Sequence, residues 1–364
     1  MNKRIKIILW VFFIGLLALA SYSLWPFKNL RNNETENTEN IDSDLTIVGF
    51  SQLGSESDWR TANTKSIQNA LTKKNGFSLI FSNGRQSQEN QIKDLRSFIF
   101  QEVDYIVIAP VTETGWDTVL EEARQAGIPV IIVDRMIETK DKSLYVASVG
   151  TDKYAEGVKA GKWLEKYLEQ QKNGSHISRK QGNLLQEPAF KEKIGQKDTT
   201  INIVVLEGTL NSTAQIGRSK GFEDVARGHK NWNILAHENG DFTKAKGKEE
   251  MEKYLKKFDK IDVLVSQNDD MTFGAIEAIQ EAGLTCGING DITIISFDAV
   301  SEAFDKMEEG LINVDIECNP MQGPMIAEII KQLEKGEKVN KLSYVDGKVF
   351  EAETASSERI GRSY

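Results

Sequence analysis

The stretch Gly49–Arg60, with the sequence GFSQLGSESDWR, decides how the chain folds. It follows Leu45, Ile47 and Val48, whose apolar and β-branched side chains are typical of a strand. From Thr61 onward the pattern indicates a helix, so the stretch joins a strand to a helix through a short polar loop. In an open α/β sheet such a loop lies at the carboxyl end of a strand, where these folds bind ligands.

The side chains of this loop are unusual for a plain connection, because they combine an amide, serines, acids, a tryptophan and an arginine. Trp59 can cover the apolar face of a sugar ring, and Arg60 together with nearby carboxylates can bind its hydroxyl groups. The alternative is that Trp59 packs over the first helix without any ligand. The stretch by itself leaves both interpretations open.

Size and composition favour a globular protein of two lobes. With 364 residues the chain exceeds one ordinary hydrophobic core. The formal net charge of −9, with no basic block beyond the first few residues, argues against nucleic acid as a partner. Cys286 and Cys318 neither demand nor exclude a disulfide, and they lack the spacing of metal ligands. We predict no metal site and no cofactor.

The N-terminal residues are predicted to form a targeting segment. A short basic start precedes an uncharged run over residues 7–27, which as a helix would span about 31 Å, close to a bilayer core. A cleavage site follows Ala20, so residues 1–28 form either a signal peptide or a membrane anchor. The anchor is favoured because the apolar run continues to Trp25, and both alternatives place the rest of the chain outside the cytoplasm.

Two further stretches are polar and show no helix or strand pattern. Residues 29–44 carry several acids and almost no apolar side chains, which predicts a disordered linker. Residues 170–200 are long for a connection between a helix and a strand, which predicts a mobile surface insertion.

Between these stretches, strands and helices alternate twice, and each series predicts a doubly wound lobe with a parallel sheet. The first series has predicted strands over 45–50, 78–81, 105–109, 128–133 and 145–149, and helices over 61–73, 86–101 and 116–125. The second has strands over 203–206, 232–237, 263–265, 292–295 and 312–316, and helices over 153–169, 214–227, 244–258, 271–282 and 300–307.

Polar residues gather where the predicted strands end. They are Asp134 and Arg135, Asp241 with Phe242, Asn268, Asp298, and Glu317 with Asn319. If the two lobes face each other, these positions open into one cleft, where charged and amide side chains can bind several hydroxyl groups. For any single Asp or Asn the alternative is a helix N-cap. Their recurrence at successive strand ends favours a shared binding site.

Signatures of catalysis are weak. Glu56, Asp58 and Asp134 could supply a glycosidase carboxylate pair, but no pattern fixes their separation. Gly49 and Gly54 match neither phosphate-binding fingerprint, and we find no serine nucleophile elbow and no His-Glu metal motif.

Several stretches carry a resemblance to a known family. They are GFSQLGSESDWR (49–60), ENQIKDLRSF (89–98), IAPVTETGW (108–116), PVIIVDR (129–135), GDFTKAKGKE (240–249), QNDDM (267–271) and NPMQGP (319–324). In this order they resemble the type I periplasmic sugar-binding proteins of ABC transporters, the ribose-binding group, and within it the galactofuranose-binding members. The resemblance implies two Rossmann-like lobes with parallel sheets, joined by a three-strand hinge. Carried onto this chain, the N-terminal lobe is 45–148 plus 320–341, and the C-terminal lobe is 149–319 plus 342–364.

The resemblance also implies a ligand site. Trp59 and Phe242 match aromatic residues that sandwich a sugar ring, and Asp134 with Arg135 matches a pair that holds ring hydroxyls. Asn268 and Asp298 match hydroxyl-binding residues of the second lobe. Glu317 and Asn319 stand near a position where ribose-binding members have glutamine, which argues against ribose. The remaining members of the implied site are Gln52, Ser55, Arg60 and Arg218.

The function implied is that of an extracytoplasmic solute-binding protein, not an enzyme, which captures a monosaccharide resembling galactofuranose, galactose or arabinose and delivers it to an ABC sugar importer. The implied partners are the sugar, the importer's permease and, through the N-terminal segment, the membrane; the protein is expected to be a monomer. One alternative is a membrane-anchored sugar sensor that signals to a histidine kinase or receptor. Another is an enzyme that processes glycosides.

Overall fold

The computed structural model describes residues 45–172, 199–362 and 364. The predicted targeting segment and linker, and residues 173–198 of the predicted insertion, lie outside the described residues. Residues 170–172 belong to a helix rather than to an insertion. None of the described helices is both long and apolar enough to cross a membrane.

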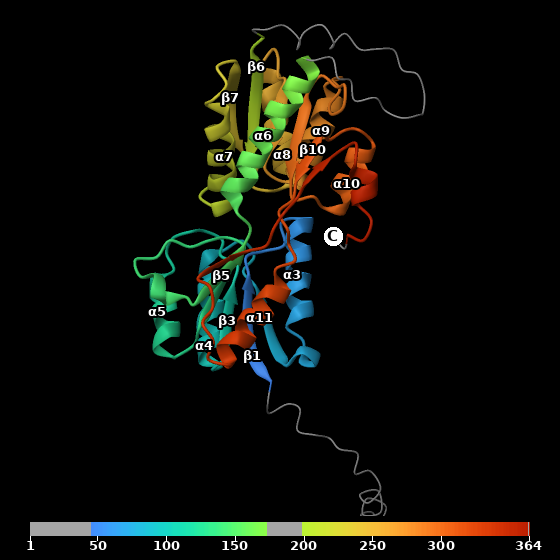
Figure 1. Cartoon of the computed structure of the whole chain (residues 1–364). Coiled ribbons are helices and arrows are strands. Elements are labelled where there is room, and N and C mark those ends of the chain that lie inside the picture. Colours follow the sequence, from blue (N-terminus) through green and yellow to red (C-terminus); the bar gives the residue numbers. More distant parts are fainter. Residues whose placement is uncertain (1–44, 173–198, 363) are drawn as a thin grey trace, which may run out of the picture. The chain divides into compact units, whose positions relative to one another are not determined.

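The first lobe is built on a six-stranded sheet with the order β11-β5-β4-β3-β1-β2, in which all neighbouring strands are parallel (Figure 1). Its strands are β1 (Thr46–Gln52), β2 (Phe77–Asn83), β3 (Tyr105–Ile108), β4 (Val130–Val133), β5 (Ala147–Gly150) and β11 (Leu342–Tyr344). Its helices are α3 (Asp58–Ala70), α4 (Gln88–Phe100), α5 (Asp117–Gln125) and α11 (Gly323–Glu334), with the short 3-10 turns η1 (Lys73–Asn75) and η2 (Lys142–Leu144).

The second lobe has a sheet of the order β12-β10-β9-β8-β6-β7, in which only the β10–β12 pair is antiparallel. Its strands are β6 (Ile201–Glu207), β7 (Trp232–Asn239), β8 (Val263–Ser266), β9 (Thr293–Phe297), β10 (Val314–Ile316) and β12 (Val349–Glu351). Its helices are α6 (Lys153–Lys172), α7 (Thr213–Ala226), α8 (Lys244–Lys257), α9 (Asp269–Glu281), α10 (Ser301–Glu308) and α12 (Ala355–Glu358).

Each sheet is buried on both faces, which explains the unbroken apolar runs in its strands. In β3, Val107 packs with α3 and α11 on one face, whereas Ile106 and Ile108 pack with α4 and α5 on the other. In β8, Leu264 packs with α8, α9 and α10, and its neighbours pack with α6 and α7. Successive side chains of a strand point to opposite faces, so both layers of helices are held to the same sheet. The predicted doubly wound architecture is confirmed.

Three connections pass between the lobes, after β5, after β10 and after β11. We call residues 317–322 the second crossover and residues 345–348 the third crossover. The expected boundary at 341/342 is early by a few residues, because Leu342–Tyr344 pairs in parallel with β5 in the first sheet. We therefore propose that the first lobe extends to Tyr344.

The helix predicted to begin at Thr61 begins instead at Asp58. Ser57 is its N-cap, and the Ser57 hydroxyl accepts a hydrogen bond from the backbone N–H of Arg60 at 3.1 Å. This places Trp59 and Arg60 on the first turn of a helix rather than in a loop, which fixes the direction of both side chains. Helix α11 was not predicted, although Pro324 at its start and the apolar spacing that follows are helix signals.

Candidate functional site

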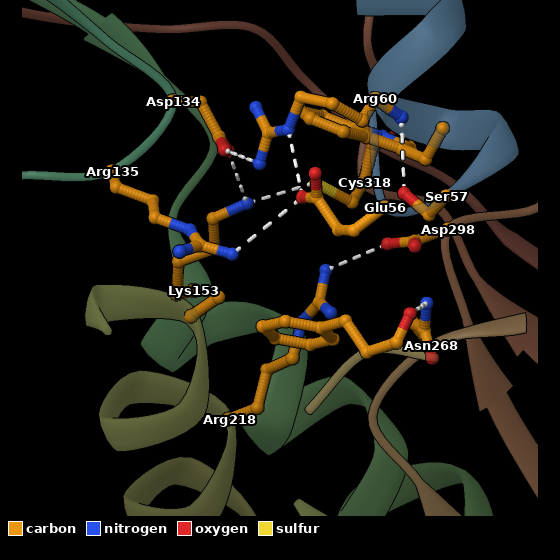
Figure 2. A pocket seen from close by; sticks show the side chains of 13 residues that line it. Glu56, Ser57, Arg60, Asp134, Arg135, Lys153, Arg218, Asn268, Asp298 and Cys318 are labelled. Atoms are coloured by element: carbon orange, nitrogen blue, oxygen red, sulfur yellow. Dashed lines mark hydrogen bonds and ion pairs between the residues drawn. The ribbon is translucent and has the colours of Figure 1, made fainter. Parts of the chain in front are cut away.

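A pocket lies where the strands of both lobes end, and it is the candidate site (Figure 2). The pocket is small: its empty space, including the solvent at its mouth, is about 290 Å³. The first lobe and the crossovers supply Glu56, Ser57, Trp59, Arg60, Asp134, Arg135 and Cys318, and the second lobe supplies Lys153, Ala214, Arg218, Phe242, Asn268 and Asp298. Both lobes and the second crossover therefore contribute to its lining.

The start of α3 presents an aromatic ring and a buried ion pair. The Trp59 indole is 3 % exposed, and its Nε1–H donates to the Cys318 carbonyl in the second crossover. The Arg60 guanidinium lies 4.7 Å from the centre of the Trp59 ring and donates from Nε to Glu56 Oε1 at 3.0 Å. Arg60 Nη1 and Glu56 Oε2 are buried without a hydrogen-bond partner. The pocket thus holds one unused donor and one unused acceptor, and a hydroxyl group can bond with either kind of atom.

Asp134 bridges two cations at the end of β4 (Figure 2). Its carboxylate lies 2.7 Å from Arg60 Nη2 and 3.1 Å from Lys153 Nζ. Burial alone would raise the pKa of Asp134, but the positive charges of Lys153 and Arg60 outweigh burial and hold that pKa below its usual range. Asp134 is therefore a fixed negative charge among cations.

Arg135 reaches across the pocket toward the second lobe. Its guanidinium lies 5.4 Å from the centre of the Phe242 ring, and Nη1 donates to the Val111 carbonyl at 3.1 Å. Burial and the nearby charge of Arg60 lower the pKa of Arg135. Next to it, the backbone N–H of Met136 donates to the Thr213 hydroxyl of α7 at 2.7 Å, so the lobes meet directly beside the pocket.

Arg218 is the centre of the charges in the second lobe. Its Nε lies 2.7 Å from Glu156 Oε2, its Nη2 lies 3.0 Å from Asp298 Oδ1, and Nη1 donates to the Gln267 carbonyl. Helices α6 and α7 pack closely enough for this contact because Gly157 has no side chain; a Cβ there would lie 2.2 Å from the Arg218 carbonyl oxygen. Burial raises the pKa of Asp298 well above its usual value, whereas the positive charge of Arg218 lowers it. Arg218 therefore favours the charged form of Asp298.

Three pocket residues have left-handed backbone conformations that non-glycine residues rarely adopt. The φ angles are 64° at Asp134, 57° at Phe242 and 108° at Asp298. Such angles persist where the surrounding structure imposes them, and they concentrate at functional sites. The Phe242 ring occupies the space beside Gly208, where a Cβ would lie 1.8 Å from the ring. The strand ends are thus shaped to aim these side chains into the pocket.

Sequence comparison assigns the family. The family described as periplasmic binding protein domain matches residues 48–338. The chain belongs to this family. It is 39 % identical to the galactofuranose-binding protein of Escherichia coli over 85 % of this chain and 89 % of the relative.

Solved structures agree with this assignment. The binding component of an arabinose ABC transporter from a Shewanella species, bound to α- and β-L-arabinofuranose, is 40 % identical, with a TM-score of 0.75 over 86 % of this chain and 94 % of that one. A Mycobacterium smegmatis protein in complex with β-D-fucofuranose is 38 % identical, with a TM-score of 0.75 over 85 % of this chain and 93 % of that one. The relatives are sugar-binding proteins, so this periplasmic binding protein is not an enzyme.

The structure brings most predicted site residues of this periplasmic binding protein into one pocket. These are Trp59, Arg60, Asp134, Arg135, Arg218, Phe242, Asn268 and Asp298. Asn268 has both of the roles considered for it, because it lines the pocket and its side chain also caps α9 by accepting from Met271 N at 3.0 Å.

Four predicted site residues do not line the pocket. Gln52 is buried and donates to Asn63 and Thr64 of α3, and Ser55 is exposed at the surface. Glu317 accepts from Lys348 N, and Asn319 donates to the Asp346 carbonyl; both partners are in the third crossover. Cys318, between them, lines the pocket, and alternate residues of an extended segment point to opposite sides.

The list of predicted site residues lacks Ser57, Lys153, Ala214 and Cys318, and it lacks Glu56, which was considered only as a loop carboxylate near Arg60 and as a possible catalytic acid. Lys153 comes shortly after the end of β5, so the expectation that site residues follow the ends of strands could have found it. It is also the first residue of a helix, and the sequence analysis assigned it to that helix. Asp58, the third acid of the enzyme hypothesis, is exposed and lies outside the pocket. Cys286 and Cys318 are free and buried, and the described residues contain no cluster that could hold a metal ion.

Proposed function

We propose that this periplasmic binding protein captures a monosaccharide in its furanose form and delivers it to an ABC sugar importer. The observation that carries the proposal is a small pocket lined from both lobes, in a chain 38–40 % identical to proteins solved with furanose sugars. The Shewanella relative is part of an arabinose transporter, which favours import over sensing. Membership of the family places the protein outside the cytoplasm.

The positions of the lining residues support an assignment of roles in sugar binding. Trp59 and Phe242 present aromatic surface from opposite lobes, while Arg60, Asp134, Arg135 and Asp298 bind hydroxyl groups. Each lobe supplies part of the contacts, so the ligand stabilises the closed arrangement in which it touches both. Exclusion of water strengthens each charge-assisted hydrogen bond in the pocket.

A thermal denaturation panel tests the proposal. The purified protein is melted with galactose, arabinose, ribose, xylose or glucose, and a ligand at 100 times its dissociation constant adds about 2.7 kcal/mol to the free energy of unfolding. We expect a raised melting temperature with arabinose or galactose and none with ribose. No shift with any of these sugars would contradict the proposal.

Replacing Trp59 by alanine is expected to weaken sugar binding by at least about tenfold, because the ring supplies apolar contact worth about 1.5–3 kcal/mol when buried. Trp59→Phe keeps most of that contact but loses the N–H bond to Cys318, so a smaller loss is expected. Calorimetry on both variants measures the effect. Trp163→Phe, in α6 outside the pocket, is the control. Equal affinity of Trp59→Ala and the unsubstituted protein would remove Trp59 from the site.

We also propose that the protein is a monomer tethered to the membrane by residues 1–28. The tether is proposed from the uncharged run over residues 7–27. The monomer is proposed because residues of a single chain line the pocket. Light scattering of the purified protein and fractionation of cells that express the full chain test the two parts. A dimer in solution would contradict the first, and release of the protein from washed membranes would contradict the second.

A further inference from the structure

Glu317, which the sequence analysis placed in the ligand site, instead bonds the second crossover to the third. Its carboxylate accepts from the backbone N–H of Lys348 at 2.8 Å, and its own backbone N–H donates to the Lys348 carbonyl at 2.9 Å. Asn319 adds a bond to the Asp346 carbonyl at 3.4 Å. The second crossover is therefore bonded to the third at several points, on the side facing away from the pocket.

Arg362, in the segment that follows α12, connects Glu317 to the turn that contains Ala299. Its Nη1 lies 2.8 Å from Glu317 Oε1, and its Nη2 donates to the Ala299 carbonyl at 2.8 Å. The guanidinium packs against aromatic rings, 4.9 Å from the centre of Phe304 and 4.6 Å from the centres of Phe350 and Tyr364. We call Glu317 and Arg362 the hinge clamp.

The carbonyl that Arg362 holds belongs to the turn that presents Asp298. This turn is strained, with φ angles of 108° at Asp298 and 58° at Ala299. Buried carboxyl groups hold its other polar atoms: Ala299 N donates to Asp315 at 3.0 Å, and Val300 N donates to Asp269 at 2.9 Å. A left-handed pair of non-glycine residues needs such fixed partners on every side, because the turn would otherwise relax.

We propose that Arg362 and Glu317 are positioning residues for the sugar site: the hinge clamp fixes the 298–300 turn relative to the second and third crossovers and thereby sets the affinity for sugar. The proposal rests on the proposed function, since Asp298 is the residue through which the clamp would act on the ligand. Neither residue touches the pocket. The segment after α12 thus contributes to sugar binding through the 298–300 turn, without lining the pocket.

The test compares two arginines of the same segment. Arg362→Met removes both clamp contacts, and we expect about tenfold weaker sugar binding by calorimetry. Arg359→Met is the matched control, because Arg359 pairs with Asp305 and Glu308 of α10 and not with the turn. Arg362→Lys should give an intermediate loss, since an ammonium group lacks the fork that reaches both partners.

Amide hydrogen exchange of the sugar-free protein supplies a second readout. Exchange at Ala299 and Val300 should be at least about tenfold faster in Arg362→Met than in the unsubstituted protein, and unchanged in Arg359→Met. If Arg362→Met does not fold, Glu317→Gln tests the same link, because the amide can still accept from Lys348 but cannot pair with Arg362 as an ion.

The proposal is overturned if the Arg362→Met protein has the same amide exchange rates at Ala299 and Val300 and the same sugar affinity as the unsubstituted protein. It is also overturned if Arg359→Met speeds exchange and weakens sugar binding as Arg362→Met does. Failure of the proposed function is a separate result, in which the unsubstituted protein binds none of the sugars. The exchange rates at Ala299 and Val300 still decide in that case whether the clamp holds the turn.

Discussion

Replacing Asp134 by asparagine is expected to weaken sugar binding by at least about 30-fold. The Asp134 carboxylate neutralises Arg60 and Lys153, at 2.7 and 3.1 Å, and it is 5 % exposed. Its removal leaves Lys153 without its carboxylate partner and Arg60 with Glu56 alone, which costs about 2 kcal/mol or more. The arrangement of charges that would receive the ligand hydroxyls is lost at the same time. Calorimetric titration with the sugar that raises the melting temperature most measures the change.

Asparagine is the informative replacement because of the backbone. Asp134 has a φ of 64°, and asparagine tolerates this left-handed conformation better than residues without a short polar side chain. Asp134→Ala is expected to lose affinity too, with additional strain of about 1 kcal/mol in the free energy of unfolding. Asp134→Asn reports the loss of the charge alone, and the additional loss of stability in Asp134→Ala reports the strain in the backbone.

Asp141→Asn is the control for the loss of one negative charge from the first lobe. Asp141 is exposed and caps η2, outside the pocket. Its replacement should leave sugar affinity unchanged. An Asp134→Asn protein that binds sugar within threefold of the unsubstituted protein would remove Asp134 from the binding machinery.

The sequence predicted the architecture well because the signals for it are local. Continuous apolar runs such as Tyr105–Ile108 occur in strands buried on both faces, and the predicted strands and helices recur in two series. The strand-end rule then selected Asp134, Phe242 and Asp298, since the carboxyl ends of parallel strands lie at one edge of a sheet. These predictions needed no knowledge of side-chain direction.

Side-chain direction is where the prediction failed. Glu317 and Asn319 are polar and follow a strand, as Asp298 does, yet the backbone turns their side chains toward the third crossover. Gln52, which the resemblance placed in the site, is the last residue of β1 and donates instead to Asn63 and Thr64 of α3. The left-handed angles that aim Asp134 and Asp298 are set by tertiary contacts, which a local pattern of residue types does not contain.

Replacing Arg218 by methionine is expected to have the largest effect on stability, a loss of about 3–5 kcal/mol in the free energy of unfolding. Arg218 is 2 % exposed and pairs with Glu156 at 2.7 Å and with Asp298 at 3.0 Å, so its removal leaves two carboxyl groups buried without their cation. The pKa of Asp298, which burial already raises, would rise further without the charge of Arg218. Sugar affinity should fall together with stability.

A double-mutant cycle separates the ion pair from the packing. Glu156→Gln removes the charge that Arg218 neutralises, so the double variant Arg218→Met, Glu156→Gln should recover part of the stability lost by Arg218→Met alone. Chemical denaturation measures all four proteins. Arg227→Met is the control, because Arg227 is an exposed residue at the end of the same helix. Equal stability of the Arg218→Met and Arg227→Met proteins would contradict a structural role for the pair.

The loss of stability in Arg218→Met is expected to depend on pH, because the Glu156 carboxyl titrates. Burial would raise the pKa of Glu156, but the charges of Lys153 and Arg218 lower it in the folded protein. The stability from this ion pair is therefore fully present above the unfolded pKa of about 4.3 and is lost as the pH falls through the folded value. In Arg218→Met the Glu156 pKa rises, so protonation relieves the uncompensated charge at a higher pH. The gap in stability between the two proteins should narrow between pH 7 and pH values below about 4, and a gap that stays the same on acidification would show that Arg218 acts through packing instead.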